Sequence, residues 1–224
     1  MKKSRPIPVA TLNQYLDHRA VGLLRTYFST GTFTGGRFER FAGGGDRADV
    51  ANVITAEDIV AVSMLGVRIP GAPALAMLEE LQPAISALLT QIPLGVDLWD
   101  AAEETVNADA AAKKLWTLLV GLPGIEWVTA GKLMARKRPR LIPVYDQVVR
   151  EALERPSPDA FFWTELRRVL LENPDVLTRL REIRDELSLF DISLLRILDV
   201  AIWMGAYGQP LPVPDEDGVP PLAP

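Results

Sequence analysis

The sequence predicts an all-α fold, a multi-helix globular domain. Apolar residues recur at helical spacing along most of the 224 residues, and capping residues or prolines stand at the starts of these segments. No series of short alternating segments indicates strands. Hydrophobic residues make up 48% of the chain and charged residues 24%, a composition that can bury a sizeable core.

The predicted helices of the first half follow from one-sided apolar patterns. The first segment places six such residues on one face: Leu12, Leu16, Ala20, Leu23, Leu24 and Tyr27. Thr55, with Asp58 three residues later, is a capping-box pattern that begins another helix. Pro73 opens the next helix, and Pro83 restarts the chain as a further one.

A long segment between these helices does not fit a helical pattern. Residues 29–54 are rich in glycine and predict a loop with a short strand or hairpin in it. Its Gly43-Gly44-Gly45-Asp46 stretch fits either a phosphate cradle or a tight connection. The dinucleotide and P-loop spacings are both absent, which favours the connection.

Helical patterns return in the second half. Asn107 is the predicted cap of one helix, and Asn173-Pro174 starts another. Asp191 is the predicted cap of the last helix. We therefore expect a single domain over 1–208, followed by a Pro-rich acidic tail over 209–224.

Residues 115–153 predict a helix, a tight turn, a second helix and, after a short loop, a third. Leu122-Pro123-Gly124 ends the first helix, because glycine permits the left-handed backbone of a hairpin. Thr129 to Lys137 forms the second, which Pro139 stops, and Pro143 marks the start of the third.

Composition excludes several kinds of chemistry. The chain has no cysteine and a single histidine, His18, so disulfides, iron–sulfur clusters and cysteine zinc sites lack their ligands. We expect no cofactor and no metal, and any chemistry must use carboxylates, hydroxyls, lysines or backbone amides. The N-terminus lacks a signal-peptide pattern and no segment is long enough to span a membrane, which predicts a cytoplasmic protein without a membrane partner.

The charge pattern is uneven. The net charge of −5 opposes nucleic-acid binding. Five basic residues nevertheless gather without an intervening acid, namely Lys132, Arg136, Lys137, Arg138 and Arg140. Salt screens charges beyond about 10 Å, so this local cluster matters more at close range than the net charge. It fits either a solvated helix face or a nucleic-acid contact.

Residues 122–149 resemble the helix-hairpin-helix DNA glycosylase superfamily. That family shows Leu-Pro-Gly, then a Thr-Ala pair, then a catalytic aspartate after a loop. Here Thr129 and Ala130 match the pair, and Asp146 lies 22 positions after Gly124, as in the family pattern. The whole chain is also similar to uncharacterised actinobacterial proteins, a resemblance that implies no function.

The resemblance implies a glycosylase-like fold and duplex DNA as a partner. Backbone amides of Gly124, Ile125 and Glu126 would hold a phosphate at a helix N-terminus. Asp146 would act on the sugar of a flipped-out nucleotide. The remaining family-like DNA contacts would come from the second helix and its end: Thr129, Lys132, Arg136 and Arg138.

This sequence departs from the family pattern at three places. Glu126 replaces the second hairpin glycine and brings a carboxylate to the expected phosphate site. Val128 stands where bifunctional members carry a Schiff-base lysine, so we expect no lyase activity by that route. Tyr145 precedes the aspartate, where the family has a small or β-branched residue.

Several interpretations stay open at the level of sequence. Asp146 fits a helix N-cap as well as a catalytic acid, and Trp127 fits a core residue as well as a wedge against DNA. On the resemblance of residues 122–149, we interpret the protein as a DNA-binding protein of the glycosylase fold and, if Asp146 is catalytic, as a monofunctional glycosylase. The alternatives are a non-catalytic nucleic-acid-binding or protein-interaction module, and a helical protein in which the hairpin is only architectural.

Overall fold

The computed structural model describes residues 5–29, 31, 33–107 and 109–207, and every regular element in them is a helix. This confirms the all-α, multi-helix prediction. The elements are α1 (Val9–Tyr15), α2 (Ala20–Ser29), η1 (Thr34–Arg37), η2 (Phe41–Gly43), α3 (Ala56–Ser63), α4 (Gly71–Leu78), α5 (Gln82–Thr90), η3 (Glu103–Thr105), α6 (Ala111–Val120), α7 (Trp127–Lys137), α8 (Gln147–Ala152), α9 (Phe162–Glu172), α10 (Pro174–Glu186) and α11 (Leu194–Tyr207).

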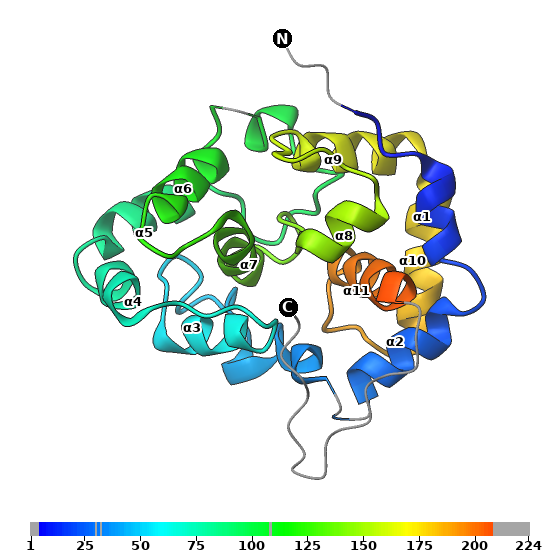
Figure 1. The fold of residues 1–224 in the computed structure, drawn as a ribbon, viewed down its shortest axis with the longest axis horizontal. Helices are drawn as coiled ribbons and strands as arrows, with labels where there is room; N and C mark the ends of the chain where they lie inside the picture. The colour runs from blue at the N-terminus through cyan, green and yellow to red at the C-terminus, as the bar shows by residue number, and fades with distance from the viewer. Residues whose placement is uncertain (1–4, 30, 32, 108, 208–224) are drawn as a thin grey trace.

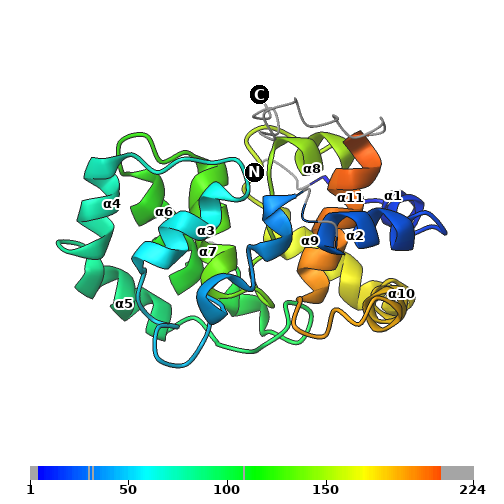
Figure 2. The same cartoon turned by 90° about the horizontal axis from the view of Figure 1, so that it is seen from below.

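The helices form two groups with a shared interior. Helices α3 to α6 lie on one side, α1, α2 and α9 to α11 lie on the other, and α7 and α8 lie between them (Figures 1 and 2). Helix α11 packs against α1, α2, α8 and α10, so the two ends of the described chain meet. The buried apolar residues of both groups belong to one hydrophobic cluster.

Several predicted helix starts are confirmed. Thr55 and Asp58 form the capping box of α3, with Thr55 N–H donating to Asp58 Oδ2 over 3.0 Å and Asp58 N–H donating to Thr55 Oγ1 over 3.4 Å. Pro83 and Pro174 lie in the first turns of α5 and α10. Helix α4 begins at Gly71, two residues before Pro73.

Other predicted boundaries are wrong. The first apolar segment is two helices, because Asp17 accepts the Arg19 N–H and makes a turn between α1 and α2. The amide oxygen of Asn107 accepts the N–H of Asp109 in a local turn, and α6 begins only at Ala111.

The starts of α11 and α8 also differ from the prediction. Asp191 binds Arg40 instead of capping α11, and the Ser193 hydroxyl accepts the Arg196 N–H at that helix start. Helix α8 begins at Gln147, four residues after Pro143.

The glycine-rich segment 29–54 contains no strand among its described residues. It folds as η1, η2 and successive turns, with Gly43 and Gly44 at positive φ values of 78° and 93°. The predicted strand or hairpin is therefore wrong. The predicted tail, 209–224, lies outside the described residues. No described helix is long and apolar enough to span a membrane.

Candidate functional site

The hairpin tip, defined as residues 121–126, joins α6 to α7 at the surface. Gly124 has the predicted left-handed backbone, with φ at 77°. Pro123, Gly124 and Glu126 are exposed, whereas Ile125 is buried and 3% exposed. The Ile125 N–H donates to the Leu122 carbonyl over 3.1 Å, so this amide is not free to bind a phosphate.

Helix α7 begins without a side-chain cap. Its N-cap residue, Glu126, has extended backbone and its carboxylate accepts no capping hydrogen bond. The first N–H groups of an α-helix have no carbonyl partner within the helix, and they form its positive end. The first N–H groups of α7 belong to the half-buried Trp127 and Val128 and to the buried Thr129.

Asp146 is the N-cap of α8, which confirms the cap interpretation. Its Oδ1 accepts the Val149 N–H over 3.1 Å. Its Oδ2 lies 3.4 Å from the Nζ of Lys132, and the side chains are 16% and 5% exposed. Asp146, at the start of α8, therefore contacts α7 through Lys132.

Lys132 bridges two loops from inside the protein. Its ammonium also donates to the Leu65 carbonyl over 2.9 Å. Burial lowers the pKa of Lys132, and the nearby Asp146 carboxylate offsets part of that effect. The structure therefore brings together two sequence-predicted residues, Lys132 and Asp146, as a largely buried ion pair.

Arg136 is buried and holds the irregular segment in place. Its guanidinium donates to the carbonyls of Phe38 and Glu39 over 2.5 and 2.9 Å, and to that of Phe41 over 2.5 Å. Asp58 accepts a bond from Arg136 over 3.2 Å and another from Lys137 over 2.8 Å. One carboxylate thus faces two buried cations.

Arg138 is also buried and also holds other segments of the chain in place by donating hydrogen bonds to their backbone carbonyls. It donates to the carbonyls of Ile92, Ala51 and Leu89 over 2.9, 2.7 and 2.6 Å. Loop carbonyls buried without secondary structure need donors, and a guanidinium provides five.

The expected exposed basic face is corrected by these contacts. Lys132, Arg136 and Arg138 are 4%, 1% and 2% exposed, so none of them presents its charge at the surface. Neither a solvated face nor an open phosphate-binding face describes these three residues, whereas Arg140 is exposed and pairs with Asp97. The Gly43–Gly45 stretch makes room for it, because a Cβ on Gly45 would lie 2.6 Å from the Arg136 carbonyl oxygen.

A cavity of about 650 Å³, the aromatic cavity, lies between α6, α7 and α9. The Tyr145 and Phe162 rings in its wall stack with centroids 3.6 Å apart, and Trp127 meets Tyr145 edge-on at 5.4 Å. Trp127 is half-buried in this wall, so it is neither a fully buried core residue nor a free wedge. Asp146 does not line this cavity.

The polar floor of the aromatic cavity is tightly bonded. Asp159 accepts two bonds from the buried Arg155 guanidinium, over 2.7 and 2.9 Å. The Tyr145 hydroxyl donates to Asp159 over 3.0 Å, and burial together with this carboxylate raises the pKa of Tyr145. Sequence reasoning missed this cavity, and its only signal was the aromatic run at residues 161–163.

The fold and site define an all-helical protein with a surface hairpin, a buried lysine–aspartate pair and a separate aromatic cavity. One family profile matches residues 20–206, most of the chain, and the protein belongs to that family, which is described as a family of unknown function (DUF6308). No curated protein and no solved structure matches the chain significantly.

Proposed function

We propose that this protein binds duplex DNA through the hairpin tip, residues 121–126. The observation that carries the proposal is the surface start of α7, which has no side-chain cap and follows a left-handed glycine. Amides at the positive end of a helix form a ready site for a phosphate. The resemblance of residues 122–149 to DNA-docking hairpins supports the same assignment.

Surface charge for this contact would come from Arg68. It is exposed and has no acidic partner among the described residues. It lies two residues before Pro70, whose Cγ would be 3.0 Å from a Cβ on Gly124. The chain segment carrying Arg68 therefore contacts the hairpin tip, and one arginine and the α7 amides together can hold one phosphate.

Binding to a fluorescently labelled duplex, followed by anisotropy over a range of salt concentrations, tests the proposal. Glu126→Gln removes a repelling carboxylate and is expected to tighten binding, whereas Arg68→Ala is expected to weaken it and to reduce the salt slope by about one. Matched controls are Glu80→Gln and Arg181→Ala, at exposed positions on other elements. Absence of binding by the wild type at low salt would refute the proposal.

Base excision at Asp146 is a second candidate function. The observation that favours it is the ammonium of Lys132, held 3.4 Å from the Asp146 carboxylate with its pKa lowered by burial. A carboxylate can stabilise positive charge that develops on a sugar. In this structure Lys132 and Asp146 are in contact, so a nucleotide would have to displace Lys132 from Asp146.

A glycosylase assay on duplexes with damaged or mismatched bases tests this second function. Asp146→Asn keeps a side chain that can cap α8 but removes the charge, so it should abolish excision. It also leaves the buried Lys132 ammonium without its carboxylate, so circular dichroism must show that the variant is folded. Lys114→Met, at an exposed lysine on α6, serves as the control and should retain full activity. If the wild type excises no base from the panel, the catalytic assignment fails and DNA binding through the tip is unaffected.

A further inference from the structure

The aromatic cavity is walled by rings from three helices. Trp116 comes from α6, Trp127 from α7 and Trp163 from α9, and all three are half-buried. The stacked Tyr145 and Phe162 rings form part of the same wall. Concave sites of about 300–1,000 Å³ with aromatic walls are typical of small-molecule binding, and aromatic faces favour planar ligands.

A glycine keeps the α7 side of this cavity open. Gly131 lies inside the helix and lines the cavity, yet a Cβ placed on it would have no neighbouring atom within 4 Å. The φ of Gly131 is not positive, and no neighbouring side chain would clash with a methyl group at this position. Neither the backbone conformation nor the packing therefore requires glycine here. Since glycine inside a helix is unfavourable, its use here is explained if a ligand approaches the helix backbone closely.

Three of the four acids in the cavity wall bind arginines, which together carry two positive charges. Asp159 binds Arg155, and Glu165 and Glu172 bind Arg168 over 3.0 and 2.5 Å. Glu103, which has no ion pair in the described part of the chain, is exposed at the rim. Because Arg168 carries one positive charge, it compensates only one of its two glutamates, and the uncompensated negative charge lies on the exposed Glu103 and Glu172 side chains.

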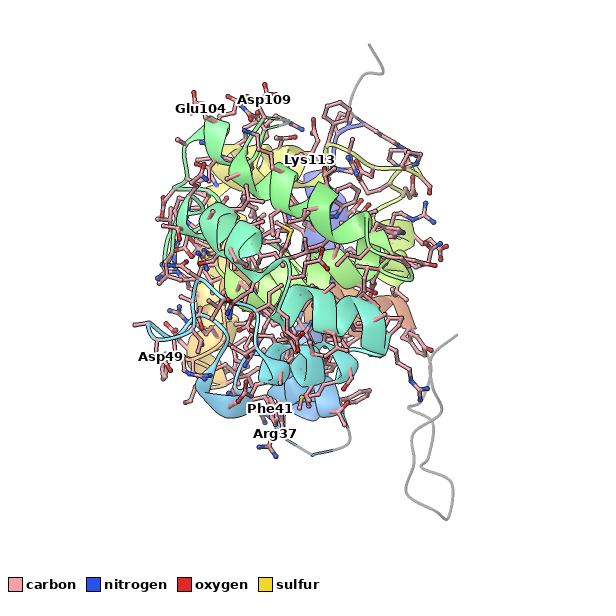
Figure 3. The ribbon with its side chains drawn as sticks, turned by 90° about the vertical axis from the view of Figure 1, so that its left-hand side faces the viewer. Arg37, Phe41, Asp49, Glu104, Asp109 and Lys113 are labelled. Carbon is pink, nitrogen blue, oxygen red and sulfur yellow. The ribbon has the colours of Figure 1, made fainter. Side chains whose placement is uncertain are left out.

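Two cations in the wall lack acidic partners among the described residues. The Lys113 ammonium lies 3.8 Å from the centroid of the Trp116 ring, and burial lowers its pKa. Figure 3 shows Lys113 at the beginning of α6, at the same end of the molecule as Glu104 and Asp109. Arg167 uses its Nε to bind the Ala101 carbonyl over 2.8 Å, which leaves its terminal N–H groups for another acceptor.

We propose that the aromatic cavity binds a planar aromatic molecule that carries one acidic group. The rings of Trp116, Trp127 and Trp163 would contact its plane, and Lys113 and Arg167 would bind its acidic group. Lys132 and Asp146 do not line this cavity, so the site is distinct from the lysine–aspartate pair, although Trp127 at the start of α7 places it next to the hairpin tip. Failure of DNA binding would leave this proposal unchanged.

Three probes of equal ring size test the proposal: 2-naphthoate, neutral 2-naphthamide and the cation 2-naphthylmethylammonium. Binding to the full chain is measured by titration calorimetry and by ligand-observed NMR. We expect one site per chain and about tenfold tighter binding of the anion than of the cation, because charge-assisted hydrogen bonds form only with the anion. Equal binding of all three probes would overturn the charge assignment, and no binding of 2-naphthoate would overturn the site.

Two pairs of variants locate the probe. Lys113→Met should weaken 2-naphthoate binding about tenfold and leave 2-naphthamide binding unchanged, whereas its neighbour Lys114→Met should change neither. Gly131→Leu should fill the cavity and abolish binding of both probes. The matched control is Gly22→Leu, at an exposed glycine of α2 that also has open space around its Cβ position. Circular dichroism confirms that each variant is folded, and retained binding in Gly131→Leu would place the probe elsewhere and reject the proposal.

Discussion

At the scale of single residues, Asp58 has two roles in one buried place. It completes the capping box of α3 and faces both Arg136 and Lys137, with all three side chains at most 1% exposed. Arg136 in turn satisfies the carbonyls of the segment that follows η1. Removing one partner from a buried ionic group is costly because the remaining charges stay buried without compensation.

Asp58→Asn should therefore reduce the free energy of unfolding by about 3–5 kcal/mol. The substitution keeps the shape of the side chain and removes its charge, which strands two cations. Asp49→Asn is the control, because the Asp49 side chain in the Arg47 ion pair is 68% exposed. Figure 3 shows Asp49 at the edge of the molecule, and its substitution should change stability by less than about 1 kcal/mol. Urea denaturation measures both, and equal small effects would show that the buried cluster is not needed for stability.

At the scale of elements, two faces of α7 contact different parts of the protein. Lys132 and Arg136 point to the loops around α3, whereas Trp127 and Gly131 line the aromatic cavity. The open space at Gly131 means that the helix gains no packing from the missing side chain. Gly205 in α11 differs, because a Cβ there would lie 2.7 Å from the Tyr15 ring in α1.

These two glycines predict opposite effects of the same substitution. Gly131→Ala should raise the free energy of unfolding by about 1 kcal/mol, since alanine favours a helix and meets no neighbour. Gly205→Ala should lower stability despite the same gain in helix propensity, because α1 must shift away from α11. Thermal and urea unfolding of both variants measure the effects, and stabilisation by both would contradict the packing between the chain ends.

At the scale of the whole molecule, ion pairs join segments that are distant in sequence. Arg40 donates to Asp191 through two bonds of 2.6 and 2.8 Å, which connects the segment between η1 and η2 to the start of α11. The hydrogen bonds from Arg40 lower the pKa of Asp191. This link belongs to the closure of the chain ends, along with the packing of α2 against α11.

The lowered pKa of Asp191 predicts a dependence of stability on pH. Its value in the folded state is below that of an unfolded aspartate, so the pair contributes stability above the unfolded pKa and loses it as pH falls through the folded one. Asp191→Asn should therefore cost about 0.5 kcal/mol at pH 7, because the pair is partly exposed, and the difference should vanish as pH falls well below about 4.

A double-mutant cycle of Asp191→Asn with Arg40→Gln, measured at pH 7 and well below about pH 4, isolates the contribution of the ion pair to stability. The coupling energy should be present at neutral pH and absent in acid. A coupling that does not change with pH would mean that the pair is held by packing and not by charge.

Local signals in the sequence were enough for much of the helical framework. The capping box of Thr55, the first-turn positions of Pro83 and Pro174, the left-handed Gly124 and the cap at Asp146 each depend on neighbours within a few residues. Such short-range preferences act in any chain that contains them. Helix class and hairpin position were therefore predictable without knowledge of distant contacts.

Asp191 and Asn107 show why other signals failed. Asp191 has a good capping side chain, but Arg40, far away in sequence, binds it instead. Asn107 forms a local turn with Asp109, which competes with capping. The partner of Asp191 depends on how distant segments pack, which the sequence does not contain directly, whereas Asn107 chooses between two local bonds.

The sequence alone was sufficient to predict the fold class and the glycine turn before α7, and to exclude chemistry that needs cysteine. Only the packed structure decided that Lys132, Arg136 and Arg138 lie inside and that rings from α6, α7 and α9 surround a cavity. The physical reason is range: helix formation follows neighbours along the chain, whereas the burial of a charge depends on the carbonyls and carboxylates that distant segments bring to it.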